Sequence, residues 1–132
     1  MGQKFLPGDR GWFASDSPSS SFSGVFEDDG ETGYFYAYDR SRTDNPILDA
    51  LHIYNVRNVT DREIESEVEI LWSADGLKAA LLINDYPHAI LDFEGKRGYC
   101  RTGFPPPTGG WRASTREPWD DSLVQWFRTP DA

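Results

Sequence analysis

The sequence predicts a mainly β protein: an antiparallel, sandwich-like meander of strands with one short C-terminal helix. Two observations carry this prediction. Apolar and polar residues alternate with a period of two along several stretches, which is the repeat of a strand with two different faces. Gly, Asp, Asn and Pro separate these stretches at short intervals, as expected when neighbouring strands pair in antiparallel hairpins.

The chain is long enough to form one domain with a substantial core. A chain of 132 residues buries roughly two-thirds of the surface that its unfolded form exposes. Hydrophobic residues make up only 38%, but the 8 Phe, 6 Tyr and 5 Trp are large, and each such side chain can bury about 150–250 Å². We therefore expect residues 1–132 to form a single domain, with a loop-rich segment over residues 1–21.

The first predicted hairpin joins residues 22–27 to residues 34–39 through a turn rich in Asp and Gly. In its second strand, Phe35 and Ala37 share one face. The other face carries three tyrosines, which are Tyr34, Tyr36 and Tyr38. The acidic turn at residues 28–31 lacks the alternating spacing of a calcium-binding loop, so we expect an acidic hairpin tip there.

Residues 47–56 fit either a helix or a strand. Leu48 and Leu51 have helical spacing, whereas Ile53 and Val56 are typical of strands. We favour a strand that starts near Ala50.

The C-terminal part cannot continue the sheet. Residues 104–118 form a Pro/Gly-rich connector, and proline removes the backbone donor that a central strand needs. We expect Trp111 and Trp119 to belong to a segment that covers a sheet face. A short helix is predicted over residues 119–128, with Asp120 or Asp121 as its N-cap.

The most informative local pattern is a hairpin centred on Asp75-Gly76, a pair that supplies positive φ angles to a tight turn. One face of this hairpin pairs apolar residues only, namely Val68 with Ile83, Ile70 with Leu81 and Trp72 with Ala79. The other face pairs Glu69 with Leu82 and Leu71 with Ala80. The first face is therefore predicted to be core, and the second to face outward.

An acidic residue stands at every odd position from 61 to 69, which predicts a strand with one face covered by carboxylates. Same-face neighbours on a strand lie about 6.5–7 Å apart, so these like charges repel one another. The candidate partner-binding residues are Glu63, Glu65, Glu67, Glu69, Leu71 and Leu82. Arg57, Arg62 or Lys78 would neutralise the row if the row were only a solvated surface.

The overall charge narrows the classes of partner. Acidic residues outnumber basic ones 22 to 13, giving a formal charge of −9. Nucleic acids and anionic membranes bind proteins through Lys and Arg, so neither is expected as a partner. A basic protein is favoured instead. The N-terminus lacks the apolar run of a signal peptide, and Cys100 is the single cysteine, so we expect a reducing, cytoplasmic location.

No sequence motif assigns a reaction. The phosphate-binding, dinucleotide-binding and zinc-protease signatures are absent, as are paired cysteine motifs. We expect no cofactor, no metal site and no catalytic residues, and a binding protein rather than an enzyme. Cys100, His88 and Asp92 would form a nucleophilic group only if the thiol and the imidazole met, and a structural role is favoured for all three.

Five strings of the sequence resemble a family of small bacterial proteins known only as a domain of unknown function. They are Glu27 to Tyr36, Leu51 to Tyr54, Leu71 to Gly76, Asn84 to Ala89 and Gly98 to Arg101. The resemblance covers approximately residues 26–104. It implies a bacterial, stand-alone, intracellular protein, and it implies no catalytic residue, cofactor or partner.

Three functions follow as hypotheses. The first is a non-enzymatic binding protein that presents its acidic strand face to a basic protein, as immunity proteins do when they cover the basic active site of a toxin. The second is a small-molecule-binding domain or minor enzyme, with a pocket lined by Tyr34, Tyr36, His88 and Tyr99. The third is a self-associating structural domain.

Overall fold

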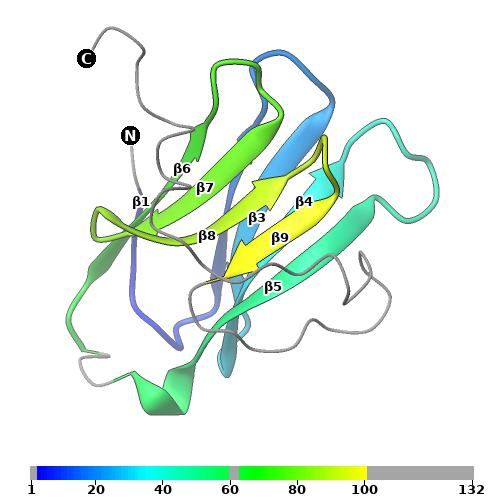
Figure 1. Ribbon diagram of the computed structural model, residues 1–132. Helices are drawn as coiled ribbons and strands as arrows, with labels where there is room; N and C mark the ends of the chain where they lie inside the picture. The colour runs from blue at the N-terminus through cyan, green and yellow to red at the C-terminus, as the bar shows by residue number, and fades with distance from the viewer. Residues whose placement is uncertain (1–2, 60–62, 101–132) are drawn as a thin grey trace, which may run out of the picture.

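The computed structural model describes residues 3–59 and 63–100, which form two antiparallel sheets packed face to face (Figure 1). The five-stranded sheet contains, in spatial order, β1 (Gln3–Phe5), β6 (Ser66–Trp72), β7 (Lys78–Ile83), β8 (Tyr86–Asp92) and β9 (Arg97–Cys100). The four-stranded sheet contains β2 (Gly11–Asp16), β3 (Phe22–Asp28), β4 (Thr32–Asp39) and β5 (Ile47–Asn55). A short 3-10 helix, Val56–Asn58, follows β5. The predicted β-sandwich class is thus confirmed.

The core lies between the two sheets. Phe26 and Phe35 from the four-stranded sheet meet Leu81 and Leu91 from the five-stranded sheet, and each of these side chains is at most 2% exposed. They alternate along their strands with residues of the outer faces, as a period of two requires. Burying one large apolar side chain contributes about 1.5–3 kcal/mol, so this layer supplies most of the stabilisation.

The predicted hairpin register between β6 and β7 is confirmed. The pairs are Val68 with Ile83, Glu69 with Leu82, Ile70 with Leu81, Leu71 with Ala80 and Trp72 with Ala79. The turn differs from the prediction, because Gly76 has a positive φ of 72° whereas Asp75 does not. The Asp75 carboxylate instead accepts hydrogen bonds from the Ser73 hydroxyl (2.6 Å) and the Leu77 amide (3.0 Å). Asp75 therefore shapes the turn through its side chain.

The other predicted strands are also present. β3 and β4 pair as expected, with Phe26 opposite Phe35. Residues 47–55 form a strand rather than a helix, and β5 begins at Ile47, earlier than the predicted start near Ala50.

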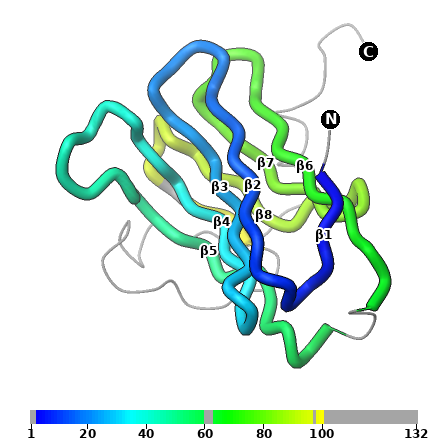
Figure 2. The backbone as a smooth tube through the Cα atoms, turned by 180° about the vertical axis from the view of Figure 1, so that it is seen from behind, coloured from blue at the N-terminus to red at the C-terminus, as the bar shows by residue number. Residues whose placement is uncertain are grey.

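The N-terminal segment contains two strands that the sequence did not predict. β1 has only three residues, too few to show an alternation, and β2 includes Gly11, Ser15 and Asp16, which are uncommon in strands. The chain passes from β1 in one sheet to β2 in the other through residues 6–10, at one side of the sandwich (Figure 2). The expectation of a loop-rich segment over residues 1–21 is therefore corrected, because this segment contains β1 and β2.

The predicted connector over residues 104–118 and the predicted helix over residues 119–128 lie outside the described residues, and both stay predictions. Within residues 3–59 and 63–100, no helix has the length and apolarity needed to cross a bilayer.

Candidate functional site: an acidic strand and an adjoining edge cavity

The acidic row lies along and just before β6. Glu67 and Glu69 alternate with the buried core residues Val68 and Ile70, so they project from the outer face of the five-stranded sheet. Glu63 and Glu65 come before β6, which begins at Ser66. We call Glu63, Glu65, Glu67 and Glu69 the acidic row; its first three members are exposed and Glu69 is half-buried.

One cation from β1 accompanies this row. Lys4 lies opposite Glu67 in the strand register, and its Nζ is 4.0 Å from Oε1 of Glu65. Both side chains are well exposed (70% and 58%), and such a pair contributes only about 0–1 kcal/mol. Lys78 instead approaches Asp75 (4.0 Å) and Glu94 (3.7 Å) near the β6–β7 turn. Among the residues that the structure describes, the row therefore keeps an excess of negative charge.

Leu71 and Leu82, the apolar residues expected beside the glutamates, are half-buried. Both pack against a second cluster on the outer face of the five-stranded sheet, made of Ala80, Ile90 and Tyr99. Ile90 is 0% exposed and Tyr99 is 8% exposed. The segment that the sequence predicts to cover a sheet face, residues 104–119, lies outside the described residues.

The expected tyrosine–histidine pocket is divided between two faces. Tyr34 and Tyr36 project from the outer face of the four-stranded sheet, because they alternate with core residues of β4. Tyr99 belongs to the outer cluster of the opposite sheet, and His88 of β8 contacts Tyr86 there, at 5.6 Å between ring centroids. The structure therefore does not bring these four side chains to one cavity.

The outer face of the four-stranded sheet carries a packed aromatic group. The Tyr34 ring stacks on Tyr36 at 5.7 Å and lies 5.6 Å from the His52 ring. The Tyr36 hydroxyl donates to Oε1 of Glu27 at 3.0 Å. Burial and then the hydrogen bond to Glu27 raise the pKa of Tyr36, so its phenol stays a neutral donor.

Cys100 and His88 lie on opposite faces of the five-stranded sheet, because Cys100 packs in the main core and His88 shares the outward parity of Ile90. The thiol is 4% exposed within the main core, and its Sγ lies 3.3 Å from the backbone carbonyl oxygen of His52. Asp92, by contrast, shares the strand parity of Ile90, which packs in the outer cluster. The structural role favoured for this cysteine stays a prediction.

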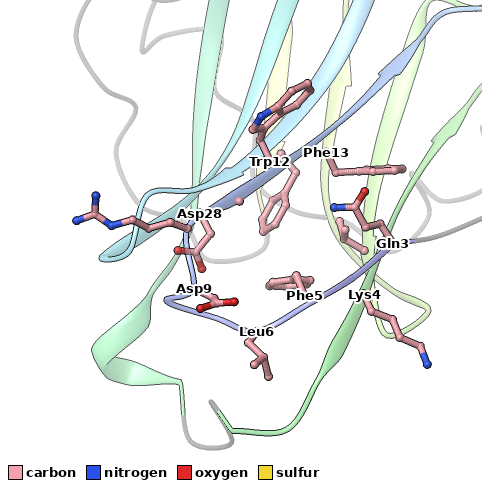
Figure 3. Close-up of a pocket in the computed structure, with 12 residues that line it drawn as sticks. Gln3, Lys4, Phe5, Leu6, Asp9, Trp12, Phe13 and Asp28 are labelled. Carbon is pink, nitrogen blue, oxygen red and sulfur yellow. The ribbon is translucent and has the colours of Figure 1, made fainter.

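A cavity that the sequence did not reveal lies where β1 and β2 approach each other at the edge of the sandwich (Figure 3). It is partly open to solvent and has a volume of about 150 Å³. Its apolar wall includes Phe5, Phe13, Phe26 and Val68. The polar residues that line it carry both signs of charge and are Gln3, Lys4, Asp9, Arg10 and Asp28. We call this space the edge cavity.

Gly11 lines the edge cavity and has no side chain to place there. Gly11 pairs with Asp28 on β3, and Phe13 pairs with Phe26, so residue 11 falls on the face that points between the sheets. A Cβ atom built at Gly11 would meet no atom within 4 Å. Glycine inside a strand often marks a place where another group approaches closely, and here it leaves open space.

A buried carboxylate holds the loop that forms one wall of the cavity. Asp28 is 3% exposed and accepts hydrogen bonds from the Gly8 amide (2.7 Å), the Gly30 amide (2.8 Å) and the Tyr54 hydroxyl (2.6 Å). Burial and then the hydrogen bond to Asp28 raise the pKa of Tyr54, which keeps this phenol protonated. The hydrogen bond from Gly8 to Asp28 holds the loop of residues 6–10, which connects β1 to β2.

The described part of the chain contains no group of three or more His, Cys, Asp or Glu placed to hold a metal ion. The fold and the site define an antiparallel β-sandwich with an acidic strand beside a small aromatic-walled cavity.

The chain belongs to the family described as "Uncharacterized protein conserved in bacteria (DUF2251)", which matches residues 5–128. The family resemblance expected from the sequence is therefore confirmed. A Haemophilus influenzae protein described as an uncharacterized protein is 48% identical over 86 residues, which is 65% of this chain. The chain spans about half the length of that curated relative (53%). No solved structure matches the chain.

Proposed function

We propose that this protein is a non-enzymatic bacterial binding protein that acts in the cytoplasm and presents its acidic row to a basic protein partner. The observation that carries the proposal is the exposure of Glu63, Glu65 and Glu67 in one continuous stretch, with Lys4 as the accompanying cation from β1. This arrangement costs stability in the free protein, because like charges that lie close together along the chain repel. A basic partner would remove that repulsion.

Electrostatic attraction would make the association with a basic partner faster and more selective. The formal charge of −9 attracts a basic partner over a distance of about one Debye length, roughly 8 Å at physiological salt. The acidic row then orients the encounter and disfavours acidic competitors. An immunity-like protein that covers a basic active site would use this arrangement.

Charge reversal tests the proposal. The double variant Glu65→Lys/Glu67→Lys places cations in the acidic row, and Glu31→Lys/Asp44→Lys makes the same change of net charge at exposed acids elsewhere. With the full chain as bait, proteins captured from the source bacterium are quantified by mass spectrometry, and the enriched partner is then purified for affinity measurement. We expect the row variant to lose this partner by at least tenfold in affinity and the control variant to keep it. Equal affinity of both variants would reject the acidic row as the binding surface.

A further inference from the structure

β2 is an open edge of the four-stranded sheet. It pairs with β3 on one side, and no strand of the described residues pairs with its other side. It lies at the side of the sandwich where the chain crosses between the two sheets (Figure 2). Its six residues keep one regular register with β3, whereas β5, at the opposite edge, pairs through two register shifts. The edges of the other sheet, β1 and β9, have only three and four residues.

The backbone groups of alternate residues in β2 point away from the sheet. In an antiparallel pair, every second residue exchanges hydrogen bonds with the partner strand, and the residues between them face the other way. The Ser17 amide donates to the Phe22 carbonyl oxygen at 2.8 Å, so the odd-numbered residues of β2 bond to β3. The N–H and C=O groups of Trp12, Ala14 and Asp16 therefore point outward from the open edge, where a further strand can pair with them.

β2 lacks the features that usually prevent such pairing. Open edges are commonly protected by proline, by lysine, by a bulge or by a charge within the strand. Residues 11–15 contain neither proline nor a charged side chain, and the single charge of β2 is Asp16 at its end. Trp12 is 67% exposed on the outer face, and its same-face neighbour Ala14 is exposed too. The edge therefore offers apolar surface together with backbone donors and acceptors.

The edge is complementary to a second copy of itself. Two β2 strands related by a two-fold axis can pair only if even-numbered residues meet even-numbered residues, because these carry the outward backbone groups. The register centred on Phe13 meets this condition. In that register, Trp12 of each copy faces Ala14 of the other copy, so a large ring covers a small side chain on both sides of the axis.

The charges near β2 favour this register. It brings Arg10, which precedes β2, near Asp16 of the other copy, and both residues are exposed. In its own copy, Arg10 rests against Gly30 and Asp16 lies 3.6 Å from Arg40, so the new pairs would select the register more than they would add affinity. The formal charge of −9 on each copy opposes association, but physiological salt screens it beyond about 8 Å.

We infer that β2 is a self-association surface, at which two copies of this chain pair β2 with β2 and join their four-stranded sheets into one. The inference goes beyond the proposed function and does not rest on it, because the acidic row belongs to the other sheet. It gives a surface to the self-association that the sequence left as a third hypothesis. One strand edge buries little area, so we expect a weak dimer with a dissociation constant of about 10–100 µM.

Sedimentation of the full chain at about 5–500 µM in physiological salt measures this association. Ala14→Pro removes an N–H that points from the open edge and none that bonds to β3, so the sandwich keeps its own pairing. Ala14→Ser is the matched control, because it keeps the N–H at the same position. We expect Ala14→Pro to weaken the dimer by at least about tenfold and Ala14→Ser to change it by less than about twofold.

NMR locates the contact in the unaltered protein. The amides of Trp12 and Ala14 should exchange with solvent more slowly as the protein concentration rises, because the dimer protects them. In a mixture of isotopically labelled and unlabelled chains, intermolecular NOEs should connect the Trp12 ring of one copy to the Ala14 methyl group of the other. These measurements decide the question if Ala14→Pro fails to fold.

Other outcomes would overturn the inference. A chain that stays monomeric at about 500 µM would do so, and would leave the edge to a strand from another protein. A dimer that Ala14→Pro does not weaken would place the contact elsewhere. Equal weakening by Ala14→Pro and Ala14→Ser would exclude backbone pairing as its cause. Loss of the dimer in Glu65→Lys/Glu67→Lys would assign the contact to the acidic row, whereas a dimer that keeps its affinity in this variant would support β2.

Discussion

The hydrogen bond from Tyr54 to Asp28 is expected to be one of the larger single polar contributions to stability. Tyr54→Phe removes the hydroxyl that donates to Oδ2 of Asp28 at 2.6 Å and retains the ring that packs 6.2 Å from Phe26. Asp28 is 3% exposed, so water cannot easily replace the lost donor. The Gly8 and Gly30 amides would remain its donors.

The expected loss follows from this geometry. A hydrogen bond to a charged group contributes about 1.5–3 kcal/mol, and the upper part of that range applies where the acceptor is buried. We therefore expect Tyr54→Phe to lower the free energy of unfolding by about 2 kcal/mol at pH 7. Tyr36→Phe is the matched control, because it removes a bond of 3.0 Å to half-buried Glu27. Its expected cost is below about 1 kcal/mol, since water can solvate Glu27.

Tyr54→Phe should also change how the free energy of unfolding depends on pH. The pKa of Tyr54 is raised in the folded protein above the ordinary tyrosine value of 10.0, so its stabilising contribution is complete below pH 10. As the pH rises beyond 10, the unfolded chain ionises first and this contribution is progressively lost. The difference in stability between the unaltered protein and Tyr54→Phe should therefore shrink above pH 10.

Urea unfolding followed by tryptophan fluorescence measures both effects. Unfolding curves at pH 7 and at several values between pH 9 and 11 give the free energies for the unaltered protein, Tyr54→Phe and Tyr36→Phe. If Tyr54→Phe lowers the free energy of unfolding by less than about 0.5 kcal/mol at pH 7, Tyr54 does not donate a strong hydrogen bond to Asp28. A difference that stays constant up to pH 11 would refute the raised pKa of Tyr54.

Further substitutions check other contacts of the sandwich. Gly33→Ala places a methyl group 2.5 Å from the Tyr54 ring, so we expect thermal unfolding to show a loss of about 1–3 kcal/mol as the ring is displaced from Asp28. Ser17→Ala removes the buried hydroxyl that donates to the Gly76 carbonyl at 2.7 Å and joins the β2–β3 loop to the β6–β7 turn. Calorimetry should show a loss of about 1 kcal/mol. Cys100 is 4% exposed, so its alkylation by iodoacetamide should proceed only at the rate of unfolding, and rapid alkylation of the native protein would contradict the described core.

Strand pairing was the part of the fold that the sequence predicted best. In the β6–β7 hairpin, the apolar residues at even positions of β6 and odd positions of β7 permit only one parity, because a slip of one residue would expose the core face. The turn chemistry was less predictable. Asp-Gly favours a primed turn, yet the Ser73 hydroxyl and the Leu77 amide offered the Asp75 side chain a different arrangement.

Parity along one strand does not say which sheet that strand joins. Tyr34 and Tyr99 both alternate with core residues, and nothing in their local sequence indicates that they lie on opposite outer faces. The face on which each tyrosine lies depends on the order of the strands in the two sheets, and long-range packing determines that order. The expected pocket failed to assemble for this reason.

The edge cavity was beyond prediction for a related reason. Gly11 lies in the segment that was expected to be loop-rich, because β1 is too short to display a period and β2 is rich in small polar residues. Only the pairing of Gly11 with Asp28 shows that its missing side chain points between the sheets. A glycine next to Trp12 and Phe13 was the one available signal.

The salt dependence of binding tests the central claim most directly. Stopped-flow kinetics from low to high salt measure the rate at which the purified partner associates with three proteins. These are the unaltered protein, Glu65→Lys/Glu67→Lys and Glu31→Lys/Asp44→Lys. We predict an association rate that falls steeply with salt for the unaltered protein and for the control, and a slow, nearly salt-independent association for the row variant. The same rates and the same salt dependence for all three proteins would show that the acidic row does not direct binding.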